Sequence, residues 1–430
     1  MPQASAKAGS IRSRQKGAPA RGAEGKPRIG LALAGGGPLG AIYEIGALCA
    51  LEESIEGLDF TRCDGYIGVS AGGFIAAGLV NGMTPRHLCA TVIENSAASA
   101  DSFDPAILLH PAWSEFRSRL SMLPGLLASA AWKSLVGGRS VVSAMERLGR
   151  ALPTGMLSSA AMGEQLREQF SLPGRSDDFR QLRSHLYLVA TDLDSGEAVP
   201  FGTPGWDHIP ISQAVRASAA LPGLFPPVEI EGRHYVDGAL KKTVHASLLL
   251  REGVDLLFCL NPLVPYEALA ADEPQDPLLP RSGRKPRIAR VVDGGLPVIM
   301  SQTLRSLIHS RLELGMKGYE RSHPGVDILL FEPDHRDAEM FFANPFSYSH
   351  RRQLAEHAYQ VTRAALRQRA TTIERQLARH GLHLRRSLLR DPKRQLLGPI
   401  QPPSRTARAM QTLDAALHEL EARLEQTPAA

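Results

Sequence analysis

The chain has 430 residues, of which 43% are hydrophobic and 22% are charged. This composition excludes collagen-like and wholly disordered chains, and the length allows one large α/β domain of about 300 residues with appendages, or two smaller domains. No apolar run of ~18 residues occurs, and the N-terminus lacks the apolar core of a secretory signal, so we expect a cytoplasmic protein.

Charge is distributed unevenly along the chain. Residues 1–28 carry +6 and residues 350–395 carry +9, which leaves about −10 on the rest of a chain whose net charge is +5. Basic ends on an acidic body suggest attraction to membrane phosphate or nucleic acid, and a solvated basic face is the alternative. We favour a peripheral contact with anionic membrane through these segments and expect no nucleic-acid partner.

The four cysteines do not suggest metal or redox chemistry. They show no C-x-x-C spacing and lie mostly in apolar runs, so we expect buried, reduced thiols. These residues are Cys49, Cys63, Cys89 and Cys259.

The chain begins with a basic tail over 1–28, which we expect to be disordered because it has almost nothing to bury. An apolar run of strand length follows over 29–34 and leads through a glycine loop, 35–40, into a helix over 41–53. A second buried strand begins at Asp64. This order predicts a βαβ unit with a right-handed crossover, so the glycine loop and the turn after the second strand lie at the same edge of the sheet.

The second strand turns sharply at Ser70 into an apolar helix over 74–79. Gly68 and Gly72 flank the serine where a tight strand-to-helix turn crowds the backbone, so the serine stands exposed above the sheet. Unpaired N–H groups at the helix N-terminus favour negative charge. The pattern predicts a nucleophile, and a chance match of common residues is the alternative.

The remaining chain predicts more of an α/β fold. Residues 84–180 are mostly helical and irregular, and a hairpin over 228–236 delivers Asp237, which Gly238 follows. A Pro-rich and charged connection spans 261–287. The other expected elements are strands over 185–191, 254–260 and 326–331, and helices over 212–220, 302–321, 351–379 and 405–424.

The glycine loop can present the backbone N–H groups of Gly35, Gly36 and Gly37 in a concave array that suits an oxyanion or a phosphate. The Lys-Ser/Thr that closes a nucleotide P-loop is missing, and Pro38 removes one donor. The spacing up to Gly40 matches a dinucleotide-binding string, but no ribose-binding acid follows at a strand end about 20 residues on. An oxyanion hole is therefore the better interpretation.

The residues leave two choices for the general base. A Ser-His-Asp hydrolase needs a histidine after Asp237, and the eight candidates from His245 to His383 lack the flanking small residues of a catalytic loop. Asp237 itself ends a strand, and Gly238 allows its carboxylate to approach a neighbouring turn. A direct Ser–Asp dyad is feasible where burial raises the proton affinity of the carboxylate.

Two other groups allow alternative interpretations. Asp192 and Asp194 lie in a Gly-containing turn that could bind a cation, although an Asx-type turn is simpler. Leucines and aromatic residues between Trp113 and Trp132 fit either an interfacial lid or core packing.

Taken together, the motifs resemble those of the patatin-like phospholipases. The ordered set is the glycine loop 35–40, the serine turn 68–72 and Asp237-Gly238-Ala239, and the segments 190–201 and 217–227 also look like that family. The resemblance spans residues 29–260. It implies a Ser70–Asp237 dyad with no catalytic histidine, metal or cofactor, and an oxyanion hole around Gly36 and Gly37. Many members carry Lys or Arg in the glycine loop, where this chain has Pro38 and Leu39.

We therefore predict a three-layer α/β sandwich around a mostly parallel sheet, acting as a serine acyl hydrolase on phospholipids or related lipids. A noncatalytic membrane-associated scaffold and a Ser-His-Asp esterase are the alternatives. The predicted parts are a tail over 1–28, a hydrolase domain over 29–349 with a helical insertion over 101–181, and a basic helical extension over 350–430.

Overall fold

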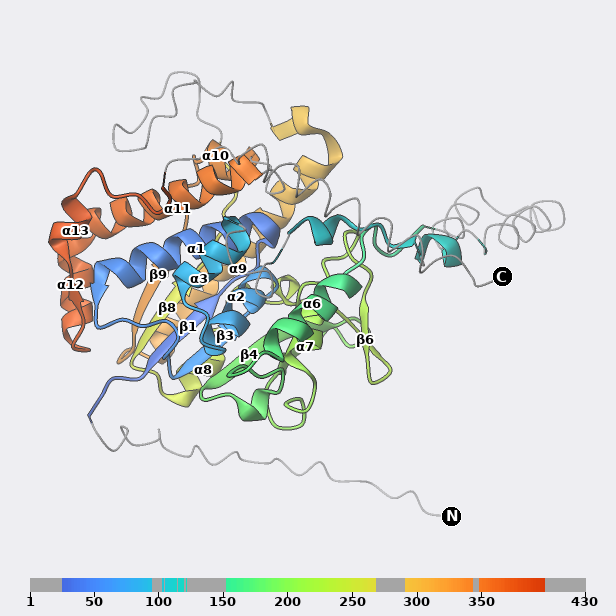
Figure 1. The fold of residues 1–430 in the computed structure, drawn as a ribbon, viewed down its shortest axis with the longest axis horizontal. Helices are drawn as coiled ribbons and strands as arrows, with labels where there is room; N and C mark the ends of the chain where they lie inside the picture. The colour runs from blue at the N-terminus through green and yellow to red at the C-terminus, as the bar shows by residue number, and fades with distance from the viewer. Residues whose placement is uncertain are drawn as a thin grey trace, which may run out of the picture. The chain divides into compact units, whose positions relative to one another are not determined.

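A mostly parallel sheet with helices on both faces forms the centre of the computed structural model (Figure 1). The structure describes residues 25–94, 103, 105–113, 115–119, 121, 152–267, 291–342 and 348–398. In these ranges the sheet has eight strands, in the order β6-β7-β4-β3-β1-β8-β9, with β5 paired to β4. The strands are β1 (Ile29–Leu33), β3 (Gly65–Gly68), β4 (His185–Asp192), β5 (Ala198–Phe201), β6 (Val228–Ile230), β7 (Arg233–Asp237), β8 (Leu256–Leu260) and β9 (Asp327–Phe331).

The five strands β4, β3, β1, β8 and β9 are mutually parallel, whereas β5 and β7 run antiparallel to β4. A small antiparallel pair, β2 (Ile55–Glu56) and β10 (His383–Leu384), lies outside this sheet. The predicted fold class is confirmed. The carboxyl ends of the parallel strands share one edge, where ligand sites form in open α/β sheets.

The helices flank the strands on both sides. Alternating strand residues such as Ala32, Ile67, Val189 and Leu257 form one core with α8 and α9, while α2 packs on β1 and β3, α1 on α2, and α11 along α1. The helices are α1 (Gly37–Ser54), α2 (Ala71–Val80), α3 (Pro85–Leu88), α6 (Ala160–Phe170), α7 (Ile211–Ser218), α8 (Ser247–Glu252), α9 (Gly295–Ser322), α10 (Ala338–Phe342), α11 (Tyr348–Gln368), α12 (Ala370–Ala378) and α13 (Arg386–Arg390).

Most of the predicted strands and helices are confirmed, and the differences have local causes. Helix α1 begins at Gly37, earlier than expected, because Pro38 occupies the first turn, where a missing N–H costs no hydrogen bond. The long helix expected over 351–379 is interrupted at Arg369. The four cysteines are buried free thiols, as expected. The tail up to residue 24, residues 122–151 of the 101–181 insertion and the helix expected over 405–424 lie outside the described residues.

The basic stretch that follows residue 350 packs against the rest of the fold, chiefly against α1, through apolar side chains. Leu354, Tyr359 and Leu366 are buried on α11, and Ile373 and Leu377 are buried on α12. Residues up to Leu396 belong to the same compact unit as the sheet. Within the described chain, no helix has the length and hydropathy needed to cross a membrane.

The prediction that the arginines of this stretch face outward is wrong for three of them. Arg351, Arg352 and Arg363 are only 4%, 7% and 2% exposed. Arg351 donates to the Val92 carbonyl, and Arg352 pairs with Glu94 at 2.7 Å. Arg351 and Arg352 tie α11 to the segment after α3, so their charge serves the fold.

Arg363 should be the most important of these residues for stability. Its guanidinium donates to the carbonyls of Leu388 and Asp391, so replacing it by Met leaves half-buried acceptors unpaired. We expect Arg363→Met to lower the free energy of unfolding by about 3 kcal/mol, measured by urea denaturation. The exposed Arg375 on α12 gives the matched control, and Arg375→Met should change nothing. Equal losses in both variants would contradict this assignment.

Candidate active site

Ser70 occupies the sharp turn between β3 and α2, as its flanking glycines predicted. Its backbone has φ 54° and ψ −123°, a conformation that side-chain-bearing residues rarely adopt. A Cβ atom added at Gly72 would lie 2.4 Å from the Ala34 carbonyl oxygen, so no larger residue fits there. The close approach of α2 to the end of β1 therefore depends on Gly72, and it holds the serine in its strained conformation.

Strand register brings Asp237 level with Ser70. Gly68 of β3 pairs with Leu188 of β4, and Asp237 of β7 pairs with Ala190, two residues further along β4. Ser70 also lies two residues beyond Gly68. Because β7 runs antiparallel to β4, it approaches this level of the sheet from the opposite direction, and its last residue is Asp237. The two predicted site residues are therefore brought together by non-local strand pairing.

The Asp237 carboxylate is buried and is 3% exposed. Burial raises its pKa to about 6, while hydrogen bonds from the Ser70 hydroxyl and the Ala239 amide act in the opposite direction. The Ala239 amide lies 2.8 Å from Asp237 Oδ1. A carboxylate with this pKa is ionised at neutral pH and can accept a proton from the serine.

Gly238 allows the turn after Asp237 to cross the end of the sheet. A Cβ atom added there would lie 2.1 Å from the Val189 carbonyl oxygen and 3.2 Å from Val69 Cγ1. The main chain at Gly238 therefore lies directly against β4 and against the residue before Ser70. This contact keeps the carboxylate beside the serine.

The glycine loop lies on the other side of the serine. A Cβ atom added at Gly35 would be 3.1 Å from Ser70 Cβ, and Gly36 lies against Gly40, the fourth glycine of the motif. Within the described ranges, the amides of Gly35, Gly36 and Gly37 donate no hydrogen bond to the protein. They are unpaired donors in a loop whose first glycine touches Ser70, and an oxyanion hole needs such donors.

The structure adds one contact that sequence reasoning missed and specifies one amide that it anticipated. The Ser70 amide donates to Ser218 Oγ at 2.8 Å, and Ser218 Oγ donates to the Val189 carbonyl at 2.6 Å. Ser218 thereby connects the serine turn to β4 from the end of α7. The amide of Ala71, the first residue of α2, is an orphan donor of a helix N-terminus and a further oxyanion candidate. The nucleophile pattern indicated the second feature, but nothing local indicated the first.

None of the eight histidines from His245 to His383 hydrogen-bonds to Ser70 or Asp237 in the described structure. His245 is the nearest in sequence, and its Nε2 lies 3.4 Å from the Gly238 carbonyl oxygen. Burial lowers its pKa to about 4, so this ring is neutral at pH 7 and donates to that carbonyl. His309, His357 and His380 pair with carboxylates elsewhere.

The turn that contains Asp192 is held by its own contacts. Asp192 Oδ1 accepts from the amides of Asp194 and Ser195 at 3.0 and 3.1 Å, and Oδ2 pairs with Arg233 at 3.1 Å. These contacts are those of an Asx-type turn. In the part of the chain that the structure describes, no three His, Cys, Asp or Glu side chains are grouped to hold a metal ion. Trp113 is 71% exposed, and Trp132 lies outside the described residues.

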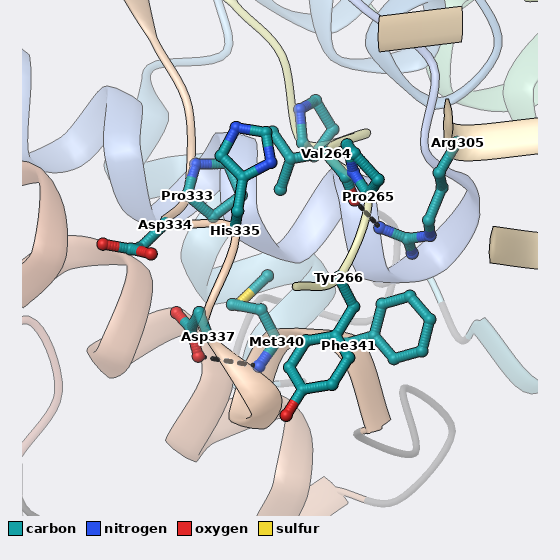
Figure 2. Close-up of a pocket in the computed structure, with 11 residues that line it drawn as sticks. Val264, Pro265, Tyr266, Arg305, Pro333, Asp334, His335, Asp337, Met340 and Phe341 are labelled. Atoms are coloured by element: carbon teal, nitrogen blue, oxygen red, sulfur yellow. Dashed lines mark hydrogen bonds between the residues drawn. The ribbon is translucent and has the colours of Figure 1, made fainter. Parts of the chain in front are cut away.

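A small pocket lies next to the glycine loop (Figure 2). Pro262, one of its lining residues, also contacts Gly36 and Gly40. Arg305 lies on one side, where it donates to the Val264 carbonyl at 3.3 Å, and Asp334 lies on the opposite side in Figure 2. Because this lining mixes charges of both signs, we assign the pocket no part in the reaction.

A comparison with protein-family models identifies one family, and solved structures give weaker matches. A family model for patatin-like phospholipase matches residues 31–250, just over half of the chain and the segment that holds Ser70 and Asp237. The type III effector protein ExoU is 16% identical, with 80% of this chain and 53% of that chain covered and a TM-score of 0.31. VipD from Legionella pneumophila is 19% identical, with 55% and 50% covered and a TM-score of 0.28. ExoU in complex with SpcU, from the type III secretion system of Pseudomonas aeruginosa, is 22% identical, with 47% and 39% covered and a TM-score of 0.21. The chain spans about half, or less, of the length of these proteins.

Ser218 should control the rate through the position of the serine turn. Ser218→Ala removes the acceptor for the Ser70 amide, so we expect turnover of a soluble ester to fall by about tenfold or more with little change in KM. Ser212 is the matched control, because it is a buried serine of the same helix that bonds Asp177 instead. Ser212→Ala should keep its turnover, and an equal effect of both substitutions would contradict the assignment.

Asp237 should reduce stability as the pH rises. Its folded pKa lies above the ordinary value of 3.8, so the native state binds more protons and stability falls between about pH 4 and pH 6. Asp237→Asn removes this penalty and should stabilise the chain at pH 8 by up to about 3 kcal/mol, with little effect at pH 4. Thermal unfolding from pH 4 to pH 8 measures the difference in stability between the variant and the native chain. A variant that is destabilised equally at pH 4 and pH 8 would contradict the burial argument.

Proposed function

Because the chain belongs to the patatin-like phospholipase family, we propose that it is a serine acyl hydrolase that cleaves acyl esters of phospholipids or related lipids through Ser70 and Asp237. One observation carries the proposal. A buried carboxylate, whose pKa burial raises to about 6 against the lowering effect of the Ser70 hydroxyl, lies beside a serine in a strained turn and near glycine amides that donate to no protein group in the described chain.

The first half of the reaction forms an acyl-enzyme. Ser70 Oγ attacks the acyl carbonyl carbon while its proton passes to the Asp237 carboxylate, and the carbonyl oxygen becomes an oxyanion. The amides of Gly36 and Gly37 donate to this oxygen, with Gly35 and Ala71 as neighbouring donors. When the tetrahedral adduct collapses, the bond to the alcohol breaks and the alcohol leaves with the proton from Asp237.

The second half releases the fatty acid. A water molecule gives a proton to Asp237 and attacks the acyl carbon, and the new oxyanion occupies the same amides. Collapse of this adduct returns the proton from Asp237 to Ser70 Oγ. No histidine takes part in this sequence, in keeping with the contact of His245 to the Gly238 carbonyl.

We infer from the family that the substrate is a lipid. Pro38 and Leu39 occupy the glycine-loop positions where many members carry a cation. We therefore propose that binding of the substrate headgroup makes no use of a loop cation, and that selectivity for headgroup charge arises elsewhere on the surface.

The dyad can be tested with a short nitrophenyl ester and a fluorophosphonate probe. We expect Ser70→Ala and Asp237→Asn each to lower kcat by about 10³-fold, because the first removes the nucleophile and the second cannot accept its proton. The probe should label the peptide that contains Ser70 in the native chain and in no Ser70→Ala sample.

A histidine substitution separates the dyad from a triad. His245→Gln should keep activity within about tenfold of the native chain, because its ring acts only through the Gly238 carbonyl. A loss as large as that of Ser70→Ala, with Asp237→Asn still active, would identify a Ser-His-Asp esterase. An unlabelled, inactive native chain would favour a noncatalytic scaffold.

A further inference from the structure

Helix α9 has apolar residues on two opposite sides. On one side Ile308 and Leu312 belong to the core beneath the sheet and are 9% and 4% exposed. On the other side Met300, Leu307 and Leu314 follow one another at intervals of seven residues and are 50%, 58% and 70% exposed. Because seven residues make almost two full helical turns, these three side chains share one face. Leu296, which is 71% exposed, extends it.

We propose that this face, which we call the α9 stripe (Leu296, Met300, Leu307 and Leu314), docks the protein on the surface of an anionic phospholipid bilayer. The proposal rests on the proposed function, since an enzyme that acts on membrane lipids must reach them at a surface. It names the surface that reaches them. Exposed apolar side chains grouped in this way are uncommon on a protein surface that has no partner.

Helix α9, which carries the stripe, lies beside the turn that follows Asp237. Thr243 Oγ1 donates to the Ile308 carbonyl at 3.1 Å, and Arg311 donates to the Leu240 carbonyl at 2.7 Å. Leu240 lies three residues after Asp237. A bilayer seated on the stripe would therefore meet the protein next to the segment that carries the proposed base.

Cations border the stripe on the same side. Lys241 and Lys242 follow the catalytic turn, are exposed and form no ion pair within the described residues. Arg311 lies about 40° from the centre of the stripe around the helix, whereas the acids Glu313 and Glu320 lie roughly 120° or more away. This arrangement of leucines flanked by cations, with the acids turned aside, complements an anionic lipid surface.

A second copy of the chain fits this face less well. A coiled-coil seam would also need apolar residues at the intervening heptad positions, and these are Thr303, Ser310 and Lys317. The C-terminal arginines are poor candidates for the lipid contact, since Arg351, Arg352 and Arg363 are buried. A flat, fluid surface that accepts leucines and cations together is the occupant that the residues favour.

Vesicle binding tests the surface without requiring catalysis. The full chain carrying Ser70→Ala is sedimented with phosphatidylcholine vesicles that contain or lack phosphatidylserine. We expect binding to the anionic vesicles only, and the double substitution Leu307→Gln with Leu314→Gln should weaken it by ~30-fold or more. Leu193 is an exposed leucine after β4, and Leu193→Gln is the matched control that should bind normally. The double substitution of Lys241 and Lys242 by Gln should weaken binding to anionic vesicles by ~10-fold or more.

Hydrolysis separates this proposal from the proposed function. With Ser70 intact, the Leu307→Gln and Leu314→Gln chain should cleave the soluble nitrophenyl ester at the native rate but hydrolyse vesicle phospholipid more slowly. Failure of the native chain to cleave the soluble ester would overturn the proposed function and leave the binding result standing. Unchanged vesicle binding by the double variant would overturn the α9 stripe. A native dimer that this variant converts to monomers would overturn it too, because the face would then lie between two copies.

Discussion

The candidate site depends on keeping one carboxylate out of water while it stays within hydrogen-bond reach of a serine. Burial raises the pKa of Asp237, and a carboxyl group that stayed protonated at neutral pH could not accept a proton. The Ser70 hydroxyl and the Ala239 amide oppose that effect and leave its pKa at about 6. The register between β7 and β4 places these groups together, because it ends β7 at the level where β3 turns. The antiparallel strand is therefore as necessary to the proposed dyad as the turn at Ser70.

The same edge of the sheet leaves almost no room for side chains. The ends of β1, β3 and β7 converge, and added Cβ atoms at Gly72 or Gly238 would lie less than 2.5 Å from backbone oxygens of the neighbouring strands. This crowding has a chemical use, because main-chain amides of the glycine loop reach positions beside Ser70 that side chains would otherwise fill. Strain at Ser70 follows from the same geometry, and packing of α2 against the end of β1 maintains it.

The sequence predicted the features that depend on neighbouring residues, and it did not specify the contacts between residues that are distant in sequence. The βαβ unit and the Ser70 turn were predictable because their signals are local, namely an apolar run, glycines and an apolar helix. Asp237 was identified by motif, but its position beside Ser70 depends on the pairing of β4 with both β3 and β7, which are distant in sequence, and periodicity cannot specify such pairing. Ser218 looked like any other hydroxyl in an alanine-rich helix. Its contact with the Ser70 amide exists only once α7 packs on β4.

Helices α11 and α9 depart from the usual pattern in which charged residues are exposed and apolar residues are buried, and the reasons differ. Arg363 on α11 is buried because carbonyls near the end of α13 need donors, so its charge is solvated by backbone oxygens instead of water. The leucines of the α9 stripe have no such compensation in the described chain, and folding gains nothing by exposing them. A polar residue at Leu307 or Leu314 would leave the core contacts of Ile308 and Leu312 intact on the opposite side of the helix. Stability of the fold therefore does not require these leucines. Their presence on a helix that packs beside the turn after Asp237 is better explained by contact with the proposed bilayer surface.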